Sequence, residues 1–164
     1  MQKLERLSLH PISETIDAIQ KFCYLTKNLS SKEAKIHIDK RTEFSGQLVR
    51  LGSVRLQTFA AYGTTCVCCN KKATHFAMER HLNNEVYHLN LYGIDDDGSE
   101  LLFTHDHILA RSLGGPDHIC NTQTMCTKCN SYKSIGEHKE FMLRKTIKKN
   151  IQNDFSSKNN VAVA

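Results

Sequence analysis

Two pairs of cysteines with the same spacing constrain this chain most. Cys66 and Cys69 form the first pair, Cys126 and Cys129 form the second, and two residues separate the cysteines within each pair. This spacing lets one tight turn direct two thiolates at a tetrahedral ion, and two such pairs complete a four-sulfur zinc site. Redox use of one pair would leave the other unexplained. We therefore expect a structural Zn²⁺ ion that joins segments separated by the 56 residues 70–125.

The remaining three of the seven cysteines are expected outside that site. Cys68 lies within the first pair and is not needed as a ligand, while Cys23 and Cys120 are predicted to be small buried residues. A disulfide framework fits poorly, because the cysteine count is odd and residues 1–6 lack the apolar core of a signal peptide. No apolar run approaches the ~18 residues that span a bilayer. These features predict a cytoplasmic protein without a membrane partner.

The net charge of +5 is unevenly distributed over the 164 residues. It amounts to −1 over residues 1–20, +5 over 21–55, −3 over 56–132 and +4 over 133–164. Basic flanks around an acidic centre suit a polyanion held by the flanks while the centre binds cations. A polyanion is therefore the expected partner.

The first third of the chain predicts a small helical region, residues 1–63. Isoleucines at helical intervals follow a candidate N-cap at Ser13, and a second helix is predicted over 47–62, with Gly63 ending it in a left-handed conformation. Between them, residues 28–45 fit a short helix or a strand equally well. The region is a candidate for DNA binding because of its positive charge.

After Gly63 the sequence pattern changes from helical spacing to alternating apolar residues separated by turn residues, which predicts strands and turns. We expect strands near 74–78, 87–91 and 101–108, followed by a helix from Cys129 or Asn130 to about Ile147. The corresponding division is a domain over 64–153 and a disordered tail over 154–164.

A dense set of polar residues lies between and just after the cysteine pairs. In order, it comprises Asp106-His107-Ile108, Ser112, Gly114-Gly115, Asn121, the pair Cys126 and Cys129, Asn130 and Lys133. This set resembles the HNH endonucleases of the His-Me finger superfamily over residues 66–136. We therefore expect an α+β protein, in which the helical N-terminal region is followed by the zinc-stabilised ββα-metal nuclease domain that the resemblance implies.

Phosphodiester hydrolysis gives these residues distinct roles. Asp106 and Asn130 supply oxygen ligands for one hard divalent cation such as Mg²⁺, which stabilises the leaving group. His107, the neighbour of Asp106 on a strand, points to the opposite side and is suited to take a proton from the attacking water. The resemblance implies the same roles, a bracing role for Asn121, and cleavage of DNA to 5′-phosphate and 3′-hydroxyl ends.

Two departures from common family members do not remove an essential group. Many members carry His where this chain has Asn130, and the 36 residues 70–105 form a longer insertion than usual. Asn favours oxygen-preferring ions slightly more than His does. We therefore expect an active enzyme, which acts as a homodimer if it cuts both strands.

Several alternatives stay open at this point. The chain can instead be a catalytically inactive zinc-containing module that binds nucleic acid, or a structural zinc protein with a protein partner. His105 is an alternative ligand, although it should face away from Asp106. Residues 95–98 resemble the start of a calcium loop, but a simple turn explains them better.

The basic side chains near the proposed site are candidate phosphate contacts. They are Arg111, Lys133, Lys145, Lys148 and Lys149. Each can equally belong to a solvated surface, because basic clusters often line the wet face of a helix.

Overall fold

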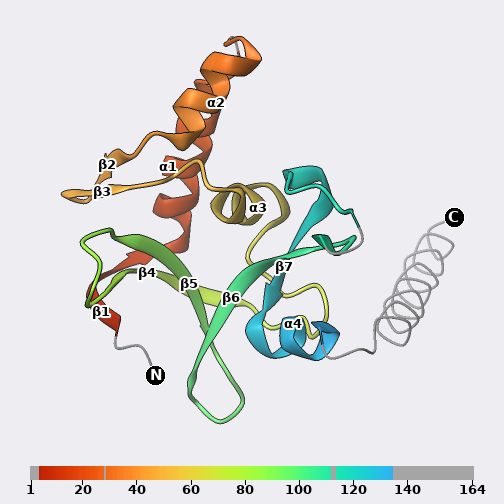
Figure 1. Cartoon of the computed structure of the whole chain (residues 1–164). Coiled ribbons are helices and arrows are strands. Elements are labelled where there is room, and N and C mark those ends of the chain that lie inside the picture. The colour runs from red at the N-terminus through yellow and green to blue at the C-terminus, as the bar shows by residue number, and fades with distance from the viewer. Residues whose placement is uncertain (1–3, 28, 112–113, 135–164) are drawn as a thin grey trace, which may run out of the picture. The chain divides into compact units, whose positions relative to one another are not determined.

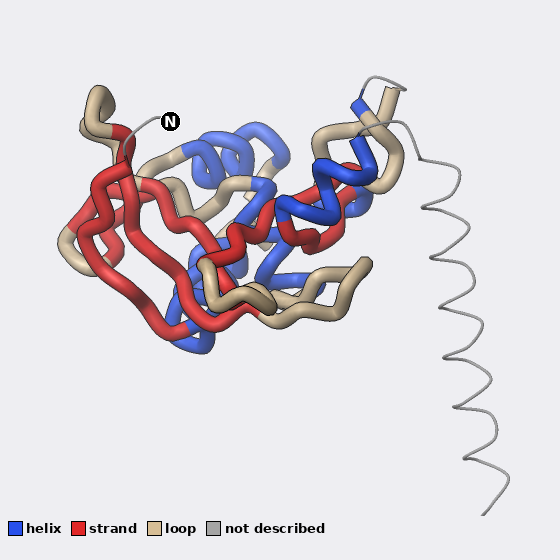
Figure 2. Tube along the Cα trace, turned by 90° about the horizontal axis from the view of Figure 1, so that it is seen from below, coloured by secondary structure: helices blue, strands red, loops and turns tan. Residues whose placement is uncertain are grey.

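A computed structural model of the chain describes residues 4–27, 29–111 and 114–134. Its main element is a five-stranded antiparallel sheet in the order β1-β4-β5-β6-β7 (Figure 1). The strands are β1 (Leu4–Pro11), β4 (Ala73–His81), β5 (His88–Ile94), β6 (Glu100–His107) and β7 (Thr122–Cys126). Figure 2 traces them next to one another. The sheet and its helices confirm the α+β class, and β4, β5 and β6 lie where strands were predicted.

The N-terminal region is not purely helical, which corrects the sequence-based description. Strand β1 pairs with β4 from Leu4 opposite His81 to Pro11 opposite His75. Its leucines are exposed, so no buried face marks the strand in the sequence. What holds β1 is its hydrogen bonding to β4 together with ion pairs such as Arg80 to Glu5, at 2.7 Å. Hydrophobic periodicity cannot reveal such a strand.

Two helices contact the sheet. Helix α1 (Ile12–Tyr24) was predicted, although it begins directly after Pro11 and Ser13 does not cap it. Helix α3 (Val54–Tyr62) contacts both α1 and the strands β6 and β7. Gly63 ends α3 with a φ of +81°, which is favourable for glycine, as the sequence predicted.

Residues 28–45, which fitted a short helix or a strand equally well in the sequence, contain both a helix and a strand. Helix α2 (Ser31–Asp39) begins at a capping box in which Ser30 and Glu33 bond each other's backbone N–H groups. Strands β2 (Thr42–Phe44) and β3 (Gln47–Val49) then form a hairpin. Its two turn residues both have positive φ, the pattern of a type I′ turn, so the helix predicted from residue 47 begins only at Val54.

The core is centred on the sheet and α3. Phe59 of α3, Phe76 of β4 and Phe103 of β6 are among its largest fully buried side chains. The rings of Phe59 and Phe76 lie 6.2 Å apart between centroids. Helix α3 also contacts β6, the strand that ends in His107.

The chain forms two compact units, residues 1–127 and residues 128–164. The predicted domain boundary between residues 63 and 64 stays a prediction, and β1, which precedes it, pairs with β4, which follows it. Helix α4 (Thr127–Ser134) begins two residues before the predicted start at Cys129. The rest of the predicted helix and the tail at 154–164 lie outside the described residues.

Candidate active site and zinc centre

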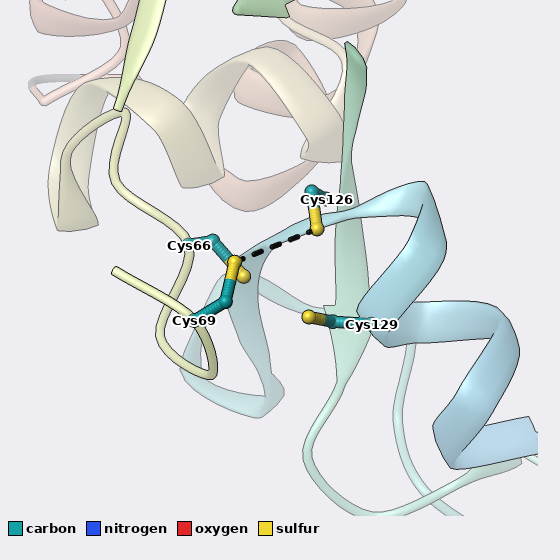
Figure 3. Close-up of side chains that lie close together, drawn as sticks. All are labelled: Cys66, Cys69, Cys126 and Cys129. Atoms are coloured by element: carbon teal, nitrogen blue, oxygen red, sulfur yellow. Dashed lines mark hydrogen bonds between the residues drawn. The ribbon is translucent and has the colours of Figure 1, made fainter. Parts of the chain in front are cut away.

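The four paired cysteines lie together, as the sequence predicted. Their Sγ atoms are all within 4.8 Å of one another, and the side chains point towards a common centre (Figure 3). The Sγ atoms of Cys69 and Cys126 are 3.8 Å apart. A tetrahedral Zn²⁺ ion with sulfur bonds of about 2.3 Å needs sulfur atoms about 3.8 Å apart. The cysteine cluster is therefore compatible with a zinc site.

The first cysteine pair lies in a tight turn between α3 and β4. The backbone N–H of Asn70 donates to the carbonyl of Cys66 at 3.0 Å, and Asn70 has a φ of +61°. The N–H of Val67 donates to the carbonyl of Thr124 at 3.1 Å, which attaches the turn to β7. This bond brings the turn beside the strand that ends in Cys126.

The environment of Cys66 favours the thiolate that a zinc ligand must be. Burial raises the pKa of the Cys66 thiol, but hydrogen bonds from backbone N–H groups, beginning with that of Cys69, outweigh this effect. The pKa of Cys66 therefore lies below its ordinary value.

The other cysteines lie outside the cluster. Cys68 and Cys23 are half-buried, and burial raises the pKa of the Cys23 thiol. Cys120, predicted to be buried, is exposed. It lies in the short 3-10 helix η2 (Ile119–Asn121), which buries Asn121 and leaves the preceding side chain at the surface.

Asp106 and His107 are the last two residues of β6 and have different surroundings. Asp106 is only 7% exposed, and its Oδ2 accepts a 2.7 Å hydrogen bond from Nε2 of Gln123 on β7. His107 is half-buried, and its Nε2 lies 3.0 Å from Oδ1 of Asp117. This contact lowers the pKa of Asp117. Successive residues of a strand point to opposite faces, so the carboxylate and the imidazole leave β6 on opposite sides.

Asn121 connects the two ends of the loop that follows β6. Its Oδ1 accepts from the N–H of Leu109 at 2.9 Å, and its Nδ2 donates to the carbonyls of Leu109 and Pro116 at 3.0 Å. Gly115 completes this arrangement, because a Cβ there would lie 1.9 Å from the carbonyl oxygen of Leu109. Asn121 thus links the backbone at Leu109 to the backbone at Pro116, which agrees with the bracing role predicted for it. The prediction that Asn121 also orients His107 stays a prediction.

The remaining predicted site residues are spread over the chain. Arg111 is exposed in the loop after β6, where its charge further lowers the pKa of Asp117. Asn130 and Lys133 belong to α4, and their predicted roles stay predictions. The basic residues Lys145, Lys148 and Lys149 lie outside the described residues.

Two groups around the site were not predicted from the sequence. Gln123 is the partner of Asp106, and Asp117 is the partner of His107. His105 was expected to face away from Asp106, and it forms a group with His107 and Asp117 whose ligand atoms lie within 4.8 Å of one another. Burial lowers the pKa of His105, and the nearby His107 lowers it further. The two-residue spacing of His105 and His107 could have indicated from the sequence that both imidazoles lie on one face of the strand. Asp117 could not have been included, because the loop after β6 brings it to this group.

The model of a protein family described as HNH endonuclease matches residues 96–143. This segment is similar to HNH endonucleases. Comparisons with curated proteins and with solved structures found no match. The family match confirms the resemblance that the motif indicated.

The HNH segment contains most of the predicted site. It includes Asp106, His107, Asn121, Cys126, Cys129 and Asn130, whereas Cys66 and Cys69 precede it. The match suggests nuclease-type chemistry that depends on metal and acts on nucleic acid. Within the described part of the chain, no helix is long and apolar enough to cross a membrane.

Proposed function

We propose that this chain hydrolyses phosphodiester bonds of DNA, with His107 as general base and one divalent cation, Mg²⁺, bound by Asp106 and Asn130. The observation that carries the proposal is the placement of Asp106 and His107 at the end of β6, within the segment that matches HNH endonucleases. A metal ligand and a base on opposite faces of one strand can approach a phosphate from two sides.

The donor set fits a hard cation. Asp106 contributes a carboxylate oxygen, and Gln123 fixes the orientation of that carboxylate. Asn130 contributes an amide oxygen. Two protein ligands of this kind leave positions for water and phosphate, as Mg²⁺ sites usually do. When bound, the cation supplies positive charge that stabilises the phosphate and the departing 3′ oxygen.

His107 takes the proton of the attacking water. A neutral imidazole near pH 7 has one acceptor nitrogen and is well matched to this task. The contact between Nε2 of His107 and Asp117 holds the ring in one orientation. Asn121, through its bonds to Leu109 and Pro116, holds the loop that carries Asp117.

The four cysteines hold a structural Zn²⁺ ion in the proposed enzyme. Four-sulfur sites leave no open position for substrate, so this ion contributes to folding and not to the reaction. Its place in the fold supports such a role, because Cys126 is the last residue of β7 and β7 pairs with the strand that carries Asp106.

Plasmid nicking in the presence of Mg²⁺ tests the proposed reaction. We expect His107→Ala to reduce the rate by roughly 10²–10⁴-fold while DNA affinity is retained, because only the proton acceptor is removed. The matched control His81→Ala, at an exposed position on β4, should nick at the wild-type rate.

The same assay separates the proposal from its main alternative. A chain that binds DNA but cuts neither DNA nor RNA with any divalent cation is a zinc-containing binding module, and the enzyme proposal is then wrong. Retention of the wild-type rate by His107→Ala would reject this residue as the base.

We further propose that double-strand cleavage, if it occurs, is carried out by a homodimer, since one active site cuts one strand. Sedimentation of the chain with and without a DNA duplex, compared with the ratio of nicked to linear plasmid, tests this part. Linear product from a monomer would contradict it.

A further inference from the structure

His105, His107 and Asp117 form a side-chain group on the face of β6 opposite to Asp106. His105 and His107 are two residues apart on the strand, so both imidazoles leave the same face. Their ring centroids are 5.3 Å apart, and Nε2 of His107 lies 3.0 Å from Oδ1 of Asp117. One ligand atom from each residue lies within 4.8 Å of the other two.

The chemistry of this group differs from that of the proposed Mg²⁺ site. Two imidazoles and one carboxylate favour Zn²⁺ and similar late first-row ions, whereas a carboxylate and an amide favour Mg²⁺. Three protein ligands also leave a fourth position for water.

Burial and partners support a ligand role for His105. Its Nδ1 is buried and has no hydrogen-bond partner among the described residues. A buried polar atom without a partner is costly, and coordination of a cation would satisfy it. The Asp117 side chain is 50% exposed, so it has room to close on an ion.

We propose that His105, His107 and Asp117 bind a second Zn²⁺ ion, and that this ion inhibits the nuclease by taking up the one lone pair with which a neutral His107 ring can accept a proton. A neutral imidazole has one acceptor nitrogen, so a metal-bound His107 cannot act as a base. The inhibitory part rests on the proposed function of His107, whereas the binding part does not.

The first measurement is zinc binding by the full chain after its four-cysteine site has been filled. Isothermal titration with Zn²⁺ should show one further equivalent for the wild type. His105→Gln should bind that equivalent at least about tenfold more weakly, because the site then has one ligand fewer. His75→Gln is the matched control, since His75 also lies on a strand of the sheet but outside the group, and it should bind like the wild type.

The second measurement is Mg²⁺-dependent nicking over a range of Zn²⁺ concentrations. Each variant's rate is divided by its own rate without added Zn²⁺, so a change in basal rate does not affect the comparison. Half-inhibition of His105→Gln should need at least about tenfold more Zn²⁺ than half-inhibition of the wild type. Asp117→Asn, at an exposed loop position, is the second variant if circular dichroism shows that His105→Gln does not fold.

The outcomes separate the two proposals. A second equivalent that disappears in His105→Gln supports the site even if no nucleic acid is cut, and only the proposed function then fails. If the wild type nicks DNA but binds no second equivalent, the site is wrong and the function stands. Equal inhibition of the wild type and His105→Gln places the inhibitory Zn²⁺ elsewhere, for example in the Mg²⁺ site, and overturns the inference.

Discussion

Gln123 on β7 donates a hydrogen bond to Asp106 on β6, and the two residues are direct partners in the register of the sheet. Both side chains are buried. The bond therefore fixes the carboxylate of Asp106 from within the sheet itself, independently of the loop that follows β6.

Replacing Gln123 should weaken the binding of Mg²⁺. We expect Gln123→Ala to raise the Mg²⁺ concentration for half-maximal nicking by about 10–100-fold, as is typical when the partner of a metal ligand is removed. The measurement is the nicking rate against Mg²⁺ concentration, and Gln20→Ala on the exposed side of α1 is the control. An unchanged Mg²⁺ requirement would show that Asp106 needs no support from β7.

Loss of one zinc ligand should unfold part of the molecule. Cys126→Ser removes a ligand that is 1% exposed, and structural zinc sites contribute on the order of 10 kcal/mol to folding. We expect this variant to lose the Zn²⁺ of the cysteine site, measured by native mass spectrometry, and to unfold at lower urea concentration. Chelation of the wild type should act in the same way.

The exposed Cys120 offers a matched control for this experiment. Cys120→Ser changes the same atoms at a position outside the cysteine cluster, so zinc content and urea midpoint should stay at wild-type values. Equal behaviour of the two variants would refute the zinc site.

Removing the side chain of Asn121 should affect the loop after β6. Asn121→Ala removes a buried side chain that makes three part-buried hydrogen bonds to the backbone of the loop, and each such bond contributes about 0.5–1.5 kcal/mol. We expect lower stability in urea and slower nicking under conditions in which the variant is still folded. Asn84→Ala, which removes one bond in an exposed turn, should change neither by much. Normal nicking by Asn121→Ala would mean that the brace does not position His107.

Neutralising the basic C-terminal run should reduce the salt dependence of DNA affinity. Changing Lys145, Lys148 and Lys149 to Gln should lower the slope of log affinity against log salt by about 0.9 for each phosphate that the chain no longer neutralises. Fluorescence anisotropy at several salt concentrations measures the slope. The same charge change at Lys32, Lys35 and Lys40, all exposed on or just after α2, measures how much the N-terminal region contributes to the salt dependence of DNA affinity. If the slope of the triple variant at Lys145, Lys148 and Lys149 equals that of the wild type, these lysines do not contact DNA and belong to the solvated face of a helix.

The parts of the fold with local signals could be predicted from the sequence. Alternating side chains around Asn83 and Asn84 indicated the hairpin of β4 and β5, and Gly63 marked the end of α3, because both signals depend on neighbouring residues only. The cysteine spacing was equally local within each pair. The assembly of the two pairs followed from the demands of a tetrahedral ion.

Other features depend on contacts that are distant in the sequence. Strand β1 is held by hydrogen bonds to β4, and its own leucines are exposed, so periodicity carried no signal for it. The start of α3 was placed too early because the turn at Ser45 and Gly46 reverses the chain first. Asp117 and Gln123 acquire their partners only when the loop and β7 return to β6.

The pairing of β1 with β4 also affects the order in which the chain can fold during synthesis. Leu4 meets His81 and Pro11 meets His75, so between 64 and 77 positions separate the partners. At about 5–20 residues per second, a ribosome needs roughly 3 to 15 seconds to add that length. Throughout that interval the leucines of β1 have no strand to pair with. Strand β1 can therefore join the sheet only once β4 has been made, and because β5, β6 and β7 follow β4 in the sequence, the β1–β4 pair is the first of this sheet that can form. A chaperone that shields the leucines of β1 has that interval in which to act.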